Sequence, residues 1–171
     1  MGFVLWMTGL PCSGKTTLSR KLSEKINNLA ILDGDELREW LSPKDFSQQG
    51  RNEHNRKVAM LAKLLLEHNV PVSVSLISPY AENRKTARQI IGNKKFVEIF
   101  IKCSLEECEI RDEKGMYKKA RNNEIKNFTG ITSKYEEPIN PDIILDTEKL
   151  SVEESVNKIL LHLKNKNLVG N

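Results

Sequence analysis

The sequence has 171 residues, of which 39% are hydrophobic and 29% charged, and its formal net charge is +4 at pH 7. This composition is typical of a single folded domain over residues 1–171 and excludes a largely disordered chain. No apolar run approaches the length of a membrane span, and the 27 basic residues are interleaved with 23 acidic ones, which argues against a nucleic-acid-binding module.

Apolar runs typical of strands alternate with helical patterns along the chain. The expected strands cover residues 3–7, 29–32, 70–77, 96–101 and 143–145, and the expected helices cover residues 15–27, 51–68, 81–91, 105–111 and 152–164. Ser104 and Glu107 are spaced as a capping box at the start of the fourth helix. Alternation of this kind predicts the α/β fold of P-loop NTPases, a parallel sheet of about five strands with helices on both faces.

The most informative stretch follows the first expected strand. Residues 9–16 fit the phosphate-loop pattern G-x-x-x-x-G-K-[ST] in full and lie between a strand and a helix, the context that the motif requires. Backbone N–H groups of such a loop face an anion, and the following helix adds its positive end. We expect Lys15 to contact the β- and γ-phosphates of ATP and the Thr16 hydroxyl to bind Mg²⁺. The residues predicted to bind ATP here are Gly9, Pro11, Cys12, Ser13, Gly14, Lys15, Thr16 and Thr17.

Two carboxylates, Asp33 and Asp35, follow the second strand. Ligands of parallel sheets bind at the carboxyl ends of the strands, so these groups are expected to face the phosphate loop. A kinase that acts on a hydroxyl needs a carboxylate to orient it or accept its proton, and an acid near Mg²⁺. We predict catalytic and metal-binding roles for Asp33. Asp35 is as well explained by a helix N-cap, and which of the two handles the proton stays open.

Two basic stretches complete the pattern. The first contains Arg38, Arg51 and His54, and its arginines suit an anionic acceptor because guanidinium groups bind such anions bidentately. The second, at about residues 112–131, is rich in Lys and has no clean strand pattern, which fits a lid that closes over the phosphates as well as it fits an exposed basic segment. Phe128 on this segment, with Phe46 opposite, is suited to stack a nucleotide base.

The three cysteines, Cys12, Cys103 and Cys108, have no metal-binding spacing. Their odd number and the absence of a signal-peptide pattern favour free thiols in a reducing cytoplasm, where we expect the protein to be located. For Cys12, inside the phosphate loop, the sequence favours the role of a small residue over a redox role.

These features together resemble the adenylylsulfate kinase family. The resemblance runs through the phosphate loop, residues 32–38, residues 77–80 and the long, specific segment 111–131. It implies ATP-dependent phosphorylation of the ribose 3′-hydroxyl of adenylylsulfate with Mg²⁺ as cofactor, and a homodimer. It also implies ATP contacts for Arg111 and catalytic roles for Lys15 and Asp33, and it places acceptor-binding residues at Asp35, Arg38, Phe46, Arg51, His54, Ile77, Ser78, Lys118 and Phe128.

The sequence departs from the family pattern in the acceptor segment. The family usually reads G-F-S-x-x-D-R-x-E-N-[IV]-R-R, whereas this chain has Gly50 in place of the Asp, His54 in place of the Asn and Asn55 in place of the aliphatic residue, and Trp40 stands where a Gly is usual. A histidine offers other hydrogen bonds than an amide, so the acceptor base is left open. Some relatives of the family phosphorylate cytidine diphosphoramidate, and this nucleotide is the alternative acceptor.

The sequence also allows two further hypotheses. A kinase for a non-nucleotide metabolite, such as a sugar acid, fits the phosphate loop but leaves Phe46 and Phe128 without a base to stack. A nucleotide-dependent regulatory or nucleic-acid-binding module would show salt-sensitive binding to polynucleotides, which the scattered basic charge does not favour.

Overall fold

The computed structural model describes residues 2–41 and 45–169. Its strands are β1 (Val4–Thr8), β2 (Ala30–Asp33), β3 (Val72–Ser75), β4 (Phe96–Lys102) and β5 (Ile143–Asp146). They pair in parallel in the order β2-β3-β1-β4-β5, with Val4 of β1 opposite Val72 and Phe96 of its two neighbours. The expected five-stranded parallel sheet is therefore confirmed.

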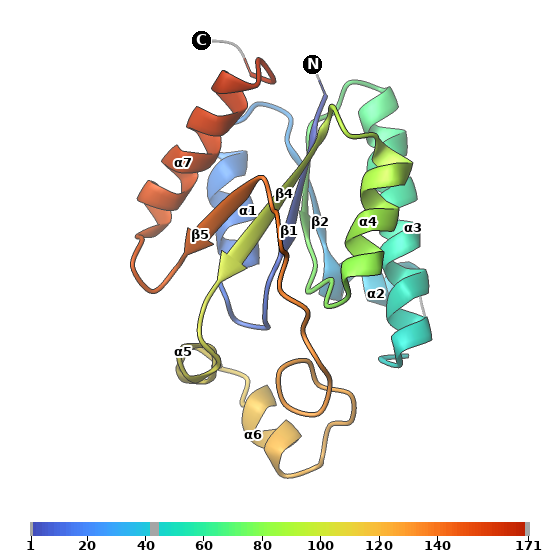
Figure 1. The fold of residues 1–171 in the computed structure, drawn as a ribbon, viewed down its shortest axis with the longest axis vertical. Helices are drawn as coiled ribbons and strands as arrows, with labels where there is room; N and C mark the ends of the chain where they lie inside the picture. The colour runs from blue at the N-terminus through green and yellow to red at the C-terminus, as the bar shows by residue number, and fades with distance from the viewer. Residues whose placement is uncertain (1, 42–44, 170–171) are drawn as a thin grey trace.

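The helices are α1 (Lys15–Ser23), α2 (Gly34–Leu41), α3 (Gln48–Glu67), α4 (Ala81–Ile91), α5 (Leu105–Ile110), α6 (Met116–Arg121) and α7 (Val152–Asn165). Figure 1 shows α1 and α7 on one face of the sheet and α3 and α4 on the other. The short helices α5 and α6 lie beyond the carboxyl ends of the strands, at the end opposite the two chain termini. No helix of the described ranges is long and apolar enough to cross a membrane.

Each face of the sheet has its own apolar core. Leu5 and Met7 of β1 pack with α1 and α7 residues such as Leu22 and Ile159, whereas Val4 and Trp6 point to the α3 and α4 side. The alternation arises because successive strand side chains point to opposite faces. All five residues of β1 are buried, as expected for the central strand of a sheet covered by helices.

Most expected boundaries hold within a few residues, and the exceptions have local causes. Helix α3 begins three residues earlier than expected because the Ser47 hydroxyl caps it by accepting from Gly50 N. Ser104 caps α5 as expected, but Glu107 does not complete the capping box: its carboxylate binds Arg111, and Ser104 N donates to Glu148 instead. Helices α2 and α6 were absent from the expected elements.

A buried hydroxyl cluster joins α1 to β3. Ser19 Oγ lies 2.7 Å from both Ser73 Oγ and Ser75 Oγ, and Ser19 and Ser73 have no exposed surface. We predict that Ser19→Ala lowers the free energy of unfolding by about 1–3 kcal/mol, because two buried hydroxyls lose a partner. Urea denaturation measures the change. Ser23→Ala, at an exposed position of the same helix, is the control, and equal effects of the two substitutions would contradict the prediction.

Candidate active site

The loop between β1 and α1 has the backbone of an anion cradle. Gly14 caps α1 with φ 103°, and Cys12 also adopts a positive φ of 62°. A Cβ on Gly9 would lie 2.5 Å from the carbonyl oxygen of Ile101, so only glycine fits there. These turns curl the chain so that the loop ends at the N-terminus of α1, where backbone N–H groups attract anions.

Lys15 is buried at the start of α1 and held by the loop itself. Its Nζ donates to the carbonyl oxygens of Gly9 at 3.0 Å and Leu10 at 2.6 Å, and to Ser13 Oγ at 3.3 Å. Burial lowers the pKa of Lys15 to about 8, because desolvation disfavours the charged form. The loop therefore holds a desolvated cation that would be stabilised by an anion.

Thr16 joins the phosphate loop to the tip of β2. Its Oγ1 donates to Asp33 Oδ2 at 2.7 Å, while Asp33 Oδ1 accepts from Asp35 N at 3.0 Å. Asp33 thus caps α2 and also faces the loop, whereas Asp35 lies exposed in the first turn of α2 and is not its N-cap. Two neighbouring oxygen donors of this kind suit Mg²⁺, which keeps most of its other ligands as water or phosphate. The described residues contain no group of three His, Cys, Asp or Glu side chains fit for a metal.

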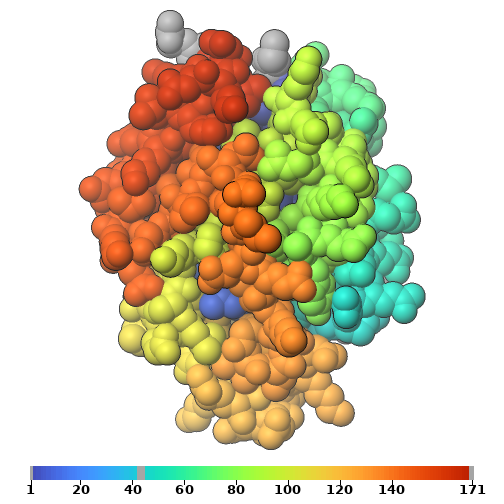
Figure 2. All heavy atoms as spheres, in the orientation of Figure 1, coloured from blue at the N-terminus to red at the C-terminus, as the bar shows by residue number. Residues whose placement is uncertain are grey.

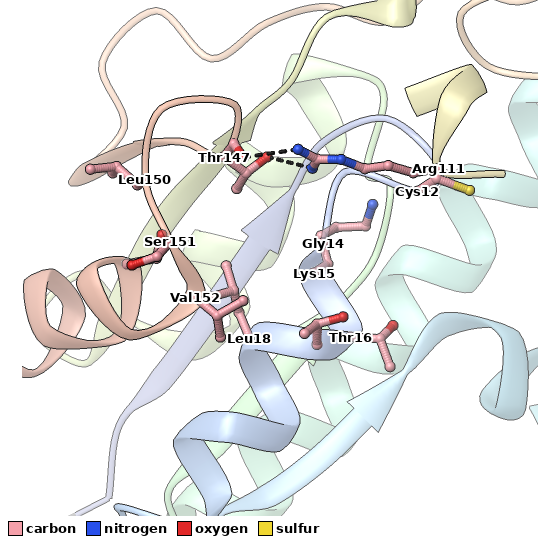
Figure 3. Close-up of a pocket in the computed structure, with 12 residues that line it drawn as sticks. Cys12, Gly14, Lys15, Thr16, Leu18, Arg111, Thr147, Leu150, Ser151 and Val152 are labelled. Carbon is pink, nitrogen blue, oxygen red and sulfur yellow. Dashed lines mark hydrogen bonds between the residues drawn. The ribbon is translucent and has the colours of Figure 1, made fainter. Parts of the chain in front are cut away.

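A cavity of about 470 Å³ opens beside the loop (Figure 3). Five of the predicted ATP-binding residues of the loop and its helix line it, together with Arg111. The guanidinium of Arg111 donates to Thr147 Oγ1 at 3.1 Å and Thr147 O at 2.9 Å, and its Nε binds Glu107 Oε1 at 2.8 Å. The cavity is therefore bounded by α1, by Arg111 after α5, and by the segment that follows β5.

The segment that follows β5, which forms the third wall of the cavity, was not predicted from the sequence. The residues that it contributes are Thr147, Leu150, Ser151, Val152 and Ser155, with Leu18 added by α1. Ser155 is 1% exposed, and its hydroxyl has no hydrogen-bond partner among the described residues. The fifth expected strand could have indicated these residues, since the residues that follow each parallel strand reach the same edge of the sheet.

The segment at residues 112–131 packs over the loop. The Tyr117 hydroxyl donates to Pro11 O at 2.9 Å, and the Phe128 ring meets Tyr117 edge-on at 4.8 Å between ring centroids. Cys108 and Ala120 complete a small apolar cluster beneath it. In Figure 2 atoms of the N-terminal part of the chain remain visible in a hollow between this segment and the main body. These contacts fix the position of residues 112–131 against the phosphate loop.

A cationic cluster lies at the start of α3. The guanidinium carbons of Arg38 and Arg51 lie 4.7 and 5.6 Å from the centre of the Phe46 ring. Arg51 is 4% exposed, and within residues 2–41 and 45–169 it donates to two backbone oxygens, Phe46 O at 3.0 Å and Asn127 O at 2.5 Å. Neither arginine forms an ion pair within the described ranges, and burial lowers the pKa of both. Two neighbouring guanidinium groups without a salt bridge to a carboxylate are suited to bind an anion.

The remaining predicted acceptor residues lie in several parts of the structure. Ile77 and Ser78 lie at the tip of β3, where Ile77 O accepts from Thr8 Oγ1 at 2.7 Å. His54 is 1% exposed, and burial is the largest cause that lowers its pKa to about 4, so its ring is neutral at pH 7. Lys118 instead lines a separate hollow of about 400 Å³ on α6. Phe128 packs on Tyr117, and no ring contact joins it to Phe46 among the described residues.

Comparison with known proteins gives a consistent result over the whole domain. The family model described as adenylylsulphate kinase matches residues 1–146. A probable adenylyl-sulfate kinase of Halalkalibacterium halodurans is 46% identical over 165 residues, which cover 94% of this chain and 82% of that protein. The adenylyl-sulfate kinase of Oceanobacillus iheyensis is 45% identical over 171 residues, which cover 97% of this chain and 86% of that protein.

Among solved structures, the APS kinase of Mycobacterium tuberculosis in complex with AMPPNP and APS superposes with a TM-score of 0.89. The two chains are 40% identical, and the match covers 95% of this chain and 98% of that one. The similarity therefore includes the elements that carry the loop, the cavity and the cationic cluster.

The low pKa of Lys15 predicts a pH dependence of ATP binding. The charged ammonium attracts phosphate, and it is lost as pH rises through about 8. We expect the Kd for ATP to be constant below pH 7 and to rise by up to about tenfold per pH unit well above pH 8, the limit for loss of one required proton. Titration calorimetry between pH 6.5 and 9.5 measures this change. Lys15→Arg, which stays charged, should lack the rise, and a flat profile for the unaltered protein would contradict the assignment.

The contact between residues 112–131 and the phosphate loop gives a second prediction. Tyr117→Phe removes the hydrogen bond to Pro11 O, so we expect the Kd for ATP to rise about three- to tenfold, the effect of one lost hydrogen bond of about 1 kcal/mol. Tyr80→Phe is the matched control, because the Tyr80 hydroxyl forms no hydrogen bond to the described residues. An unchanged Kd in Tyr117→Phe would exclude a contribution of this contact to nucleotide binding.

Proposed function

The chain belongs to the adenylylsulphate kinase family, and on this premise we propose that it transfers the γ-phosphoryl group of ATP to the ribose 3′-hydroxyl of adenylylsulfate. The observation that carries the proposal is the 2.7 Å contact between Thr16 Oγ1 and Asp33 Oδ2. It joins a phosphate-binding loop to a carboxylate, which are the two groups that phosphoryl transfer to a hydroxyl requires.

In the proposed reaction Lys15 neutralises charge on the transferred phosphoryl group, since it is the one lysine held inside the loop's cradle. Asp33 orients the acceptor hydroxyl and accepts its proton as the new oxygen–phosphorus bond forms and the bond to the leaving ADP breaks. Asp35 lies close enough for its charge to act on both Lys15 and Arg38, so it is placed between the donor and acceptor sides. The cavity beside Arg111 holds the ATP adenosine.

The cofactor of the proposed reaction is Mg²⁺. Thr16 and Asp33 supply neighbouring oxygen donors that would hold the ion, and the ion would supply positive charge that neutralises the phosphates. The protein's own part is to fix these two oxygens, which it does by placing Thr16 at the start of α1 and Asp33 at the tip of β2.

On the acceptor side, Arg38 and Arg51 bind the anionic part of the nucleotide. Both are partly desolvated cations with no ion-pair partner among the described residues, and both lie against the Phe46 ring. Phe46 is 40% exposed, so part of its ring is open to stack a base. Ile77 and Ser78 border the same side at the tip of β3.

The relatives described above are named as adenylyl-sulfate kinases, and one of them was solved with APS, which supports adenylylsulfate as the acceptor over cytidine diphosphoramidate. The altered residues Gly50, His54 and Asn55 are the reason to test both nucleotides. We also infer a cytoplasmic homodimer from the family resemblance, and light scattering of the purified protein tests the assembly.

The central test is turnover. We expect the protein, with ATP and Mg²⁺, to convert adenylylsulfate to its 3′-phosphorylated product and ADP, measured by chromatography of the nucleotides. With adenylylsulfate and cytidine diphosphoramidate at equal concentration, adenylylsulfate should be consumed first. Lys15→Ala should lower kcat by at least about a hundredfold, as expected when a group that stabilises transferring charge is removed.

His54→Asn, run in the same competition, tests whether His54 takes part in the choice of base. A shift in the preference ratio assigns that part to it. Consumption of cytidine diphosphoramidate alone would transfer the proposal to that acceptor, and turnover of neither nucleotide would refute it.

A further inference from the structure

Ser78, at the tip of β3, is held in an unusual conformation. Its φ is 42°, in the left-handed region that a residue with a side chain rarely adopts, and the residue is 1% exposed. Such strain persists only where surrounding contacts fix it, and it is frequent at functional sites. The contacts that fix Ser78 are therefore informative about the acceptor side.

The hydroxyl of Ser78 is bound on both sides within the core. It accepts from Trp6 Nε1 at 3.0 Å and donates to Asn55 Oδ1 at 2.5 Å. Asn55 is 4% exposed, and its Nδ2 donates to Arg51 O at 2.8 Å. The Ser78 hydroxyl thus links β1 to α3, the helix that carries Arg51 and His54.

The carbonyl of Ser78 is bound by Arg84. This side chain of α4 is 3% exposed, and its Nη1 donates to Ser78 O at 2.7 Å. Its Nη2 donates to Glu136 O at 2.7 Å, and its Nε pairs with Glu98 Oε1 at 3.0 Å. One guanidinium therefore joins the tip of β3, the core of β4 and the segment at residues 134–138.

That segment, which we call the strap, is the return path from residues 112–131 to β5 and crosses the ends of the strands (Figure 1). Glu136 N donates to Pro79 O, and Glu136 Oε2 accepts from Ala81 N, both at 2.8 Å. Tyr135 OH lies 2.9 Å from Thr8 Oγ1, directly before the phosphate loop. The strap is thus fixed to Pro79 and Ala81, which follow Ser78 in the sequence, and to the end of β1.

We propose that Arg84 and Asn55 are positioning residues that hold Ser78 for acceptor binding, and that Arg84 fixes Ser78 by joining it to the strap. The inference rests on the proposed function, because it takes Ser78 as part of the acceptor site. Neither residue reaches the phosphate loop in any contact given above, so their effect is expected on the acceptor and not on ATP.

The chemistry of the side chain favours arginine at position 84. Three donors in one rigid plane reach two carbonyl oxygens and a carboxylate at once, whereas the ammonium of lysine is a point charge on a flexible stem. Lysine would keep a positive charge near Glu98 and lose the fixed spacing between Ser78 O and Glu136 O. Arg84→Lys therefore removes the positioning of Ser78 while it keeps the positive charge beside Glu98.

The experiment compares Arg84→Lys with Arg88→Lys. Arg88 also pairs with Glu98, at 3.3 Å, and with Asp142, at 2.8 Å, but it does not contact Ser78 or Glu136. We expect Arg84→Lys to raise KM for adenylylsulfate about tenfold or more with KM for ATP changed less than about twofold. Arg88→Lys should leave the ratio of the two KM values unchanged, even if it lowers the Tm as much as Arg84→Lys does.

Asn55→Leu keeps the number and branching of the side-chain heavy atoms and removes the contact from α3 to Ser78, so it should shift the same KM ratio in the same direction. It decides the matter if Arg84→Lys does not fold. An unchanged ratio in the folded variants, or an equal rise in both KM values, would overturn the positioning role. Failure of the unaltered protein to phosphorylate adenylylsulfate would refute the proposed function, which is a separate outcome from unaltered KM ratios in an active enzyme.

Discussion

The parallel pairing of β1 with β3 and β4 is the constraint on which the proposed active site depends. Because all five strands run in one direction, their carboxyl ends meet at one edge, and each of four strands delivers a group there. The groups are the phosphate loop after β1, Asp33 of β2, Ser78 after β3 and Thr147 after β5. The strands themselves are held by apolar packing on both faces, so the positions of these polar groups are set by a core in which they take no part.

Polar groups buried at that edge fall into two kinds. Thr8, Ser78 and Arg84 have hydrogen-bond partners within the protein, so they are rigid and serve to place others. Lys15 and Arg51 are also buried, but each donates to backbone oxygens and neither forms a salt bridge with a carboxylate among the described residues. Groups with partners inside the protein hold other residues in place, whereas a buried cation without a salt bridge is stabilised when an anion binds beside it.

Most of the fold could be predicted from the sequence, and so could the grouping of the phosphate-loop residues beside one cavity, because both follow local rules. Strands and helices follow periodic patterns, and the phosphate loop is a contiguous motif whose geometry is fixed by its own glycines. Arg84 and Ser155 could not be predicted, since each lies on a helix whose sequence pattern is ordinary. Arg84 acquires its role from a contact with Glu136, 52 positions away in the sequence. Ser155 acquires its role because its helix forms a wall of the cavity. Helix α6 was missed because six residues are too short for a periodic signal.

The proposed donor and acceptor sides both contain basic side chains whose pKa values are lowered by burial. Burial lowers the pKa of Lys15 on one side and of Arg38 and Arg51 on the other, so in each case the charged form is disfavoured before a ligand arrives. An anion that binds there relieves this cost, so ligand binding and folding stability are coupled at both sides. The charge of Asp35 acts on both Lys15 and Arg38, so in the proposed reaction negative charge is available near the hydroxyl that loses its proton. The proposed role of the cations is therefore to attract two anionic substrates that would repel each other in solution.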